Sequence, residues 1–339
     1  MSLTNLTNRT LRLIAVLVPL VLAPQLLVPQ DVTPPFSEWL DGVRAEALAR
    51  GVRQEIVDRA LGDLQEPIAV AIERDRAQPE TALSLEAYIS SRVRPATIRT
   101  GRQMLGRYRT LLNRVSGTYG VPAPVIVAIW GLESNFGRIT GAQPTIPVLA
   151  TLAWDPRRSN LFRRELFSAL DIANREEIEI PRMRGSWAGA MGQPQFMPSS
   201  YLQYAVDFDG DNRRDIWDSR ADIFASIANY LKEKGWVTGR RWGREVIVPR
   251  GSEIDVPRRE GSCRATRDMT VALPLEEWQR LGVRRTGNAA LPQADFPGFL
   301  VSGSSRHFLV YDNYDALLSY NCAHAYALSV ALLSDRIAN

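Results

Sequence analysis

VIVAIWGLESNFG, residues 125–137, is a helical run of apolar residues that ends on a carboxylate, Glu133. Desolvation disfavours the charged form of a carboxyl group, so a Glu held against Trp130 and Phe136 would stay protonated near neutral pH and act as a proton donor. The alternative is a Glu at a helix end that reaches water, which is the common case for this residue type. The stretch alone leaves both interpretations open.

Length and composition indicate a globular protein. The chain has 339 residues, 45% of them hydrophobic, which suffices for a core in one large domain or two to three modest ones. The formal charge of +4 includes Arg9 and Arg12 in a leader without acids, so the chain without that leader carries 4 − 2 = +2. A balance this small gives no support to nucleic-acid binding.

The first thirty residues resemble an export signal. Arg9 and Arg12 precede an apolar stretch, residues 13–28, which two prolines interrupt. We therefore expect an exported, periplasmic protein, either soluble after cleavage or anchored by an uncleaved leader. No cysteine precedes Cys263, so this is not a lipoprotein attached through an N-terminal cysteine.

The sequence contains two cysteines, Cys263 and Cys322. In an oxidising compartment they either form a disulfide or remain two separate buried thiols, and their spacing does not decide between these. A disulfide would link a β-rich segment to the C-terminal helix.

Helical patterns dominate the chain after a proline-rich linker. Apolar spacing predicts helices at residues 36–50, 54–61, 96–119, 161–174 (with Ser159 as cap) and 222–234, and irregular structure at 63–83. Short alternating segments between residues 245 and 312, separated by Gly, Pro and Ser, predict a small β-rich insertion. Residues 313–336 return to a helical pattern rich in Ala and Leu.

We therefore predict a mainly α (α+β) protein in five segments. They are an export signal or anchor (1–30), an N-terminal helical domain (31–121), a helical core with an acidic loop (122–240), a small β-rich domain (241–312) and a C-terminal helix that returns to the core (313–339).

GSWAGAMGQPQFMPSSY, residues 185–201, is dense in glycine, amides and aromatic rings. Glycines let the backbone approach a ligand closely, while Ser186 and Gln195 offer hydrogen bonds. The alternative is a tight turn that leads into a helix starting at Pro198.

The acidic loop DFDGDNRRDIWD, residues 207–218, has acids at positions one, three, five, nine and twelve, as the calcium loop of an EF-hand does. Asn212 replaces the usual turn glycine, and Asn tolerates a left-handed backbone. The alternative is an acidic surface loop. The predicted calcium ligands are the side chains of Asp207, Asp209, Asp211, Asp215 and Asp218 and the carbonyl of Arg213.

Four motifs together resemble the lytic murein transglycosylase B family. They are ESNFG at 133–137, GAMGQPQFMPSSY at 189–201, the acidic loop and SYN at 319–321. The match covers nearly everything after the leader, in the family's order and spacing. The resemblance implies a lysozyme-like helical catalytic core, a flanking helical domain and a small β domain, with bacterial peptidoglycan as the substrate.

The resemblance also implies roles for single residues. Glu133 matches the catalytic acid of the family, and Ser186 and Gln195 match polar residues beside the reacting sugar. The other matches are Tyr320 and Asn321 with cleft residues near the acid, Tyr230 with an aromatic residue of the glycan cleft, and Arg157 and Arg158 with a basic pair that resembles a contact for the peptide stem.

Only one carboxylate has the surroundings expected of a catalytic acid. Glycosidases usually use two, about 5–9.5 Å apart, but the acids of the loop at 207–218 are assigned to a cation. Glu165 and the Glu cluster at 176–179 lie on helical patterns that predict solvated faces. In a single-acid mechanism the 2-acetamido carbonyl of N-acetylmuramic acid is the nucleophile, and Glu133 later changes from acid to base.

The sequence thus predicts an exported, mainly helical glycan-cleaving enzyme. The resemblance implies that it is a lytic transglycosylase, which cleaves between N-acetylmuramic acid and N-acetylglucosamine and closes a 1,6-anhydro ring. The alternatives are a lysozyme-like hydrolase, in which water completes the reaction, and a wall-binding scaffold without chemistry. Neither His307 nor His324 has a second ligand at metal spacing. Expected partners are glycan strands, a membrane through the leader and other cell-wall enzymes, with structural calcium and no organic cofactor.

Overall fold

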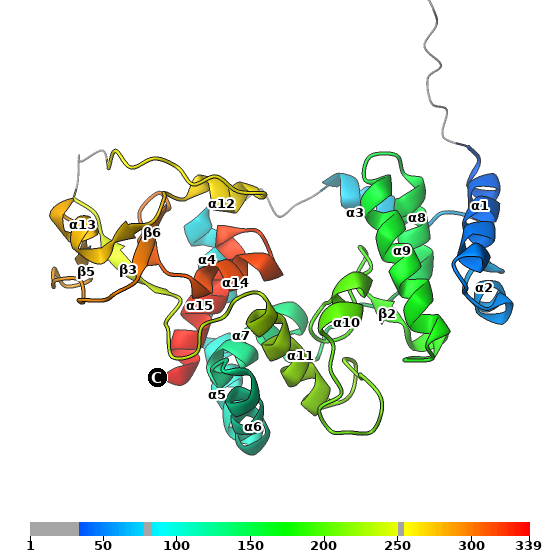
Figure 1. Ribbon diagram of the computed structural model, residues 1–339, viewed down its shortest axis with the longest axis horizontal. Helices are drawn as coiled ribbons and strands as arrows, with labels where there is room; N and C mark the ends of the chain where they lie inside the picture. Colours follow the sequence, from blue (N-terminus) through cyan, green and yellow to red (C-terminus); the bar gives the residue numbers. More distant parts are fainter. Residues whose placement is uncertain (1–33, 78–82, 250–253) are drawn as a thin grey trace, which may run out of the picture. The chain divides into compact units, whose positions relative to one another are not determined.

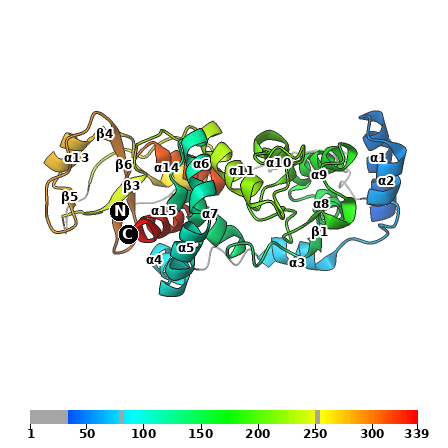
Figure 2. The ribbon, with the colours of Figure 1, turned by 90° about the horizontal axis from the view of Figure 1, so that it is seen from below.

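Helices make up most of the protein, as the sequence predicts. The computed structural model describes residues 34–77, 83–249 and 254–339, and the expected leader at 1–30 lies outside them. The residues described from Pro34 onward belong to one compact unit. These residues form fifteen α-helices and two antiparallel sheets; Figures 1 and 2 show how the elements are arranged.

Four predicted helices are confirmed to within two residues at each end: those at 36–50, 54–61, 161–174 and 222–234. The observed bounds are α1 (Phe36–Ala49), α2 (Gln54–Leu61), α3 (Ala69–Ala77), α4 (Leu85–Arg92), α5 (Pro95–Arg107), α6 (Arg109–Tyr119), α7 (Ala123–Ser134), α8 (Thr145–Trp154), α9 (Ser159–Asn174), α10 (Pro198–Tyr204), α11 (Arg220–Glu233), α12 (Arg264–Asp268), α13 (Leu275–Arg280), α14 (Asn313–Tyr320) and α15 (His324–Ala338).

Helix starts follow local chemistry in two cases and depart from it in a third. Pro198 opens α10, because its fixed φ suits a first helical turn. Ser219 caps α11 by accepting a hydrogen bond from the backbone N–H of Asp222. Ser159 was expected to cap α9, which is wrong: it is already helical, and its hydroxyl donates to the carbonyl of Ala153 at 2.6 Å.

Three other expectations about helices are wrong. Residues 63–83 were expected to be irregular, but α3 lies within them. The helix expected at 96–119 breaks at Tyr108, whose ring packs edge-on against Trp130 and Phe224 at centroid distances of 6.0 and 5.5 Å. The continuous pattern at 313–336 is divided into α14 and α15 by a turn that begins at the extended residue Asn321.

The β-rich insertion is confirmed between residues 243 and 310. Its five strands are antiparallel in the order β4-β6-β7-β3-β5, and a separate two-stranded sheet pairs β1 with β2. A small core of its own, with Trp278 fully buried, lies under the larger sheet. The strands are β1 (Gln143–Pro144), β2 (Arg184–Gly185), β3 (Gly243–Ile247), β4 (Leu273–Pro274), β5 (Arg284–Arg285), β6 (Pro297–Ser302) and β7 (His307–Val310).

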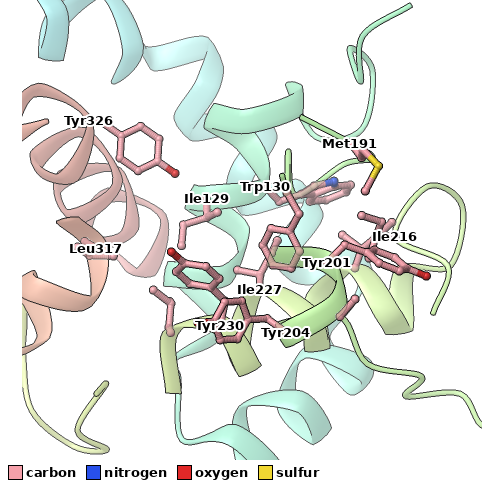
Figure 3. Packing of buried hydrophobic residues seen from close by; sticks show 14 of the residues in the cluster. Ile129, Trp130, Met191, Tyr201, Tyr204, Ile216, Ile227, Tyr230, Leu317 and Tyr326 are labelled. Atoms are coloured by element: carbon pink, nitrogen blue, oxygen red, sulfur yellow. The ribbon is translucent and has the colours of Figure 1, made fainter. Parts of the chain in front are cut away.

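The main core surrounds α7, which is buried from Val125 to Gly131. α15 packs against α7, α4 and α5, and the red α15 appears close to α7 and to the cyan α4 in the ribbon views (Figures 1 and 2). Figure 3 shows Tyr326 of α15 facing the helix that carries Ile129 and Trp130, with Tyr230 and Tyr204 below. Within the described ranges no single helix is both long and apolar enough to cross a bilayer; α6 and α7 pass that test only together, bent by 108°.

Cys263 and Cys322 form a disulfide, with their Cα atoms 6.3 Å apart. Of the two alternatives that the sequence left open, a disulfide or two separate buried thiols, the structure has the disulfide. The bond joins the residue before α12, in the β-rich region, to the turn between α14 and α15. It therefore attaches the insertion to the turn rather than to the body of the C-terminal helix.

Candidate active site

Glu133 lies in the last turn of α7, where the buried helix emerges from the core. The residues before it are almost all buried, whereas Leu132 and Glu133 are half-buried. Glu133 lines a hollow of about 300 Å³, whose walls come from the end of α4, the start of α5 and the end of α7. Among the described residues that line this hollow, Glu133 is the only carboxylate.

A left-handed turn fixes the end of α7. Asn135, Phe136 and Gly137 have φ values of 49°, 60° and 80°. Phe136 folds back over Gly131, where an added Cβ would lie 2.7 Å from the Phe136 ring, so glycine is needed there. Ser134 braces the turn by accepting the N–H of Gly137 at 3.1 Å. The turn therefore holds Glu133 on a rigid element.

Tyr326 holds the carboxylate of Glu133. Its hydroxyl donates to Oε1 at 2.5 Å, and the Tyr326 side chain is only 5% exposed. Burial raises the pKa of Tyr326 well above its usual value, and the charge of Glu133 adds to this, so the hydroxyl keeps its proton. Sequence reasoning missed Tyr326; the available signal was a polar-tipped aromatic in an Ala- and Leu-rich helix, six residues after Tyr320.

Ser186 and Gln195 lie on the predicted glycine-rich loop, and some of their polar atoms form hydrogen bonds with backbone groups of the protein. The Ser186 oxygen accepts the N–H groups of Ala188 and Ala190 at 3.2 and 3.1 Å. Gln195 Nε2 donates to the carbonyls of Thr140 and Gly192 at 3.0 and 2.8 Å. Among the described residues these bonds leave the Ser186 hydroxyl hydrogen and the Gln195 carbonyl oxygen without a hydrogen-bond partner.

Gln193, which sequence reasoning did not single out, connects α7 to the acidic loop. The side chain is 3% exposed; its Oε1 accepts the indole N–H of Trp130 at 2.7 Å, and its Nε2 donates to the Trp217 carbonyl at 2.5 Å. Gly137 passes so close that a Cβ there would collide with the Gln193 amide. One buried amide therefore joins the helix of Glu133 to residues 207–218.

Three aromatic rings bring α11, α14 and α15 together beside the loop. The Tyr320 hydroxyl donates to the Pro194 carbonyl at 2.7 Å, and its ring lies 4.8 Å from that of Tyr230 and 6.3 Å from that of Tyr326. Burial, then the charge of Glu133, raises the pKa of Tyr320 well above its usual value. Tyr230 is 7% exposed and donates to the Ser319 carbonyl, while Asn321 is exposed.

Arg157 and Arg158 do not line the hollow beside Glu133. Both donate to Asp75 of α3, at 2.8 and 2.9 Å, and Arg157 also pairs with Asp155. Asp75 is 4% exposed, so the two guanidinium groups compensate a buried charge and hold α3 against the turn before α9.

Glu165 and Glu177 were expected on solvated faces, which is wrong. Glu165 is 6% exposed and accepts the N–H and the hydroxyl of Ser199 at 2.9 and 2.7 Å, at the start of α10. Glu177 is half-buried and ion-paired with Arg214. Both partners lie far away in the sequence, so helical periodicity alone did not reveal them. Neither carboxylate lines the hollow beside Glu133.

The acidic loop gathers three of its predicted ligands. One carboxylate oxygen each from Asp207, Asp209 and Asp211 lie within 4.8 Å of one another. Asn212 adopts a φ of 67°, as expected for the residue at the turn position. Asp215 accepts the N–H groups of the next turn, and the N–H of Arg213 donates to Asp211. Asp218 pairs with Arg182. An oxygen-only cluster of this kind suits calcium.

Asp222, which sequence reasoning also missed, binds two backbone N–H groups of the acidic loop from the first turn of α11. It is fully buried in the first turn of α11 and accepts the N–H of Phe208 at 2.7 Å and that of Asp215 at 2.8 Å. Burial raises the pKa of Asp222 to about 6, with a contribution from Asp209. The two bonds hold both ends of the loop against α11.

His324 should make the folded protein less stable as the pH falls from about 6.5 to 4. Burial lowers the pKa of His324 to about 4, in spite of the nearby charge of Asp268, and the Tyr314 hydroxyl lies 3.0 Å from Nδ1. The folded state then binds fewer protons than the unfolded state, so its stability is complete above about 6.5 and declines below it, by at most about 3 kcal/mol.

Urea unfolding at several pH values between 7.5 and 4.5 measures this loss. His324→Phe keeps a ring beside Tyr314 and cannot titrate, so its stability should vary less with pH. His307→Asn, at the only other histidine in the sequence, is the control. An equally steep decline in His324→Phe would contradict the assignment.

The sequence and the fold of this chain are similar to those of known proteins. A family model described as the transglycosylase SLT domain matches residues 35–335. Membrane-bound lytic murein transglycosylase B of Escherichia coli (strain K12) is 34% identical over 247 residues, 73% of this chain and 65% of that protein. The chain thus spans slightly less than two thirds of the curated relative's length.

Two solved structures extend the similarity. SltB3 from Pseudomonas aeruginosa, in complex with NAG-NAM-pentapeptide, is 39% identical with a TM-score of 0.83, covering 90% of this chain and 80% of that one. The Escherichia coli lytic transglycosylase Slt35, in complex with calcium, is 27% identical with a TM-score of 0.72, covering 90% of this chain and 93% of that one.

Proposed function

The chain belongs to the transglycosylase SLT domain family, and on this basis we propose that it is a lytic transglycosylase of bacterial peptidoglycan. Its substrate is the glycan strand, which it cuts between N-acetylmuramic acid and N-acetylglucosamine. Two relatives support this substrate class: one is named for murein, and the other was solved with NAG-NAM-pentapeptide.

The observation that carries the proposal is the setting of Glu133. This carboxylate ends a buried helix, is held by Tyr326 at 2.5 Å and lines a hollow in which no other described residue is acidic. A lone carboxyl group cannot supply both an acid and a separate nucleophile. The nucleophile must therefore come from the substrate.

The reaction runs in two steps. Glu133 gives its proton to the glycosidic oxygen, the bond from that oxygen to the anomeric carbon breaks, and the 2-acetamido carbonyl oxygen of the same muramic residue bonds to that carbon. The Glu133 carboxylate then takes the proton of the 6-hydroxyl, whose oxygen attacks the anomeric carbon and displaces the acetamido oxygen. A 1,6-anhydro ring results, and Glu133 is protonated again.

In this proposal, residues of the glycine-rich loop and of the region around α14 orient the sugar. The Ser186 hydroxyl hydrogen and the Gln195 carbonyl oxygen hydrogen-bond the reacting muramic residue, and Asn321 adds an exposed amide. Tyr320 and Tyr230 form the aromatic support beside them. Arg157 and Arg158 contact the peptide stem with the guanidinium edges that their ion pairs leave exposed, about two fifths of each side chain.

Mass spectrometry of digests of isolated glycan strands tests the reaction. Anhydro ends are one water lighter than the reducing ends that a hydrolase produces. Reducing-end products would replace the proposal with the hydrolase, and the absence of any product from a folded, strand-binding protein would favour the scaffold.

The acidic loop holds one structural calcium ion in this proposal, with Asp207, Asp209 and Asp211 as the central ligands and Asp215, Asp218 and the carbonyl of Arg213 completing the set. Support comes from the convergence of three carboxylates and from the calcium complex of the relative Slt35. When bound, the ion neutralises the mutual repulsion of these acids. Through Gln193, which bonds both Trp130 and Trp217, the ordered loop stabilises the end of α7.

Millimolar calcium should raise the melting temperature by a few degrees relative to chelator. With a dissociation constant of about 10⁻⁴ to 10⁻³ M, 5 mM calcium adds roughly 1–2 kcal/mol to the folded state. Asp209→Asn should remove the difference, whereas Asp63→Asn, an equal charge change at an exposed site elsewhere, should keep it. Overlapping melting curves of the unmodified protein in calcium and in chelator would refute the site.

Export to the periplasm completes the proposed function. The basic and apolar leader at residues 1–30 either is removed or anchors the protein, and it has no cysteine through which a lipid could be attached. The segment boundaries at 121, 240 and 312 remain predictions, as do contacts with other cell-wall enzymes.

A further inference from the structure

A second hollow, of about 390 Å³, lies where the region of β3 and β5 meets α5 and α15. It shares no lining residue with the hollow at the end of α7. Five arginines line it, and we name it the arginine pocket: Arg102 from α5, Arg241 before β3, Arg244 in β3, Arg285 in β5 and Arg336 from α15.

Positive charge exceeds negative charge in this pocket. Glu245 and Asp335 are its only acidic side chains among the described residues, so the side chains alone carry 5 − 2 = 3 positive charges in excess; Asn339, the last residue of the sequence, also lines the pocket. Glu245 is already paired with Arg306, outside the pocket, through two bonds of 2.8 Å. Asp335 is shared between the guanidinium of Arg241 and the indole N–H of Trp242, each at 3.3 Å.

Three of the arginines are held in place, and two are available to a ligand. Arg102 donates to the Arg336 carbonyl at 2.8 and 3.1 Å, Arg244 donates to the Tyr311 hydroxyl at 2.7 Å, and Arg241 is paired as above. Arg285 and Arg336 are exposed, and within residues 34–77, 83–249 and 254–339 their guanidinium groups form no hydrogen bond or ion pair.

We propose that the arginine pocket binds an acidic peptide, namely the carboxylate-bearing peptide stem of peptidoglycan, an assignment that rests on the proposed function. The planar fork of a guanidinium matches a carboxylate through two parallel hydrogen bonds. Trp242 and Leu332 form an apolar wall of the pocket. The carboxylate of Asp335 can accept a hydrogen bond from the amino group of a diamino acid in the stem.

Peptide is favoured over a lipid surface by the shape and lining of the pocket. Membrane-surface binding combines basic groups with apolar side chains that insert between lipids. None of the large apolar residues that the described chain exposes lines this hollow. Arginines fixed around a concavity suit a discrete ligand with several carboxylates.

Along the axis of α15, the pocket lies within one stem length of Tyr326. On α15, Leu332 and Arg336 follow Tyr326, the partner of Glu133, by 6 and 10 residues, or about 9 and 15 Å at the helical rise. An extended peptide of five residues spans roughly 17 Å. The pocket therefore serves as a second anchor for substrate, apart from the bond that is cleaved.

Calorimetric titration with a synthetic stem pentapeptide that lacks sugar tests the proposal, because binding is then measured without cleavage. Arg285→Gln/Arg336→Gln should weaken binding at least about tenfold, since it removes two charge-assisted contacts. Arg99→Gln/Arg109→Gln, an equal charge change at exposed sites of α5 and α6, should bind as the unmodified protein does. A peptide with amidated carboxylates should also bind at least about tenfold more weakly.

Four outcomes overturn the proposal: no binding by the unmodified protein, equal weakening in the control, equal binding of the amidated peptide, or binding of phosphatidylglycerol vesicles in place of peptide. Melting curves establish that each variant is folded. Glu133→Gln should bind the pentapeptide normally, so a failure of the proposed cleavage reaction and a failure of the pocket are distinguishable.

Discussion

Glu133→Gln should lose essentially all bond cleavage and still bind glycan strands. Glutamine keeps the shape of the side chain and can still accept the hydrogen bond from Tyr326. It has no proton to give to the leaving oxygen and cannot take one from the 6-hydroxyl, so both steps fail. General acid–base catalysis contributes about 10²- to 10⁴-fold per proton transfer, and the loss should reach at least that range.

Product release from isolated strands measures the rate of each variant, and co-sedimentation with purified cell walls measures binding. Glu179→Gln, an identical change at an exposed position, is the matched control and should retain full activity. Glu165→Gln tests the buried Glu165 instead: it removes the acceptor of one of the two hydrogen bonds from Ser199, and it should lower the stability of the fold rather than the rate of cleavage. Activity of Glu133→Gln near that of the unmodified protein would mean that another group is the acid.

Removing the disulfide should destabilise the protein by about 4 kcal/mol. Cys263 and Cys322 are 59 residues apart, and closing a loop of this length restricts the unfolded chain by about that free energy in the chain-entropy model. The bond also restrains the turn between Tyr320 and Tyr326. Cys322 is exposed, so reductant reaches it in the folded state.

Urea unfolding with and without reductant gives the difference in unfolding free energy. Cys263→Ser/Cys322→Ser should match the reduced protein, and reductant should not affect it further. Hydrogen exchange should show the largest loss of protection around α12 and the turn after α14. If the oxidised and reduced proteins have equal stability, the disulfide contributes nothing to the fold.

Local chemistry in the sequence was enough to predict much of the helical architecture. The boundaries of α2 and the start of α10 depend on apolar spacing and on proline at a first turn, both of which are local. The break at Tyr108 was not visible because it depends on the packing of that ring against Trp130 and Phe224. Likewise α3 carries Asp75, whose arginine partners lie 82 and 83 residues away.

The candidate site was predictable where residues form a contiguous motif and missed where a partner comes from another element. Glu133 and the carboxylates of the acidic loop stand out in the sequence because apolar or acidic neighbours surround them. Tyr326 reaches Glu133 from 193 residues away, and Asp222 closes the acidic loop from the next helix. Helical periodicity placed Glu165 in solvent, because it contains no information about Ser199.

The buried amide of Gln193 has a consequence for sequence variation in proteins of this fold. A side chain at position 137 would need the space that the amide occupies, and a shorter residue at 193 would leave the Trp130 indole N–H and the Trp217 carbonyl without their partner. Positions 130, 137 and 193 should therefore change together or not at all. A redesign of the end of this helix must therefore choose the residues at these three positions together.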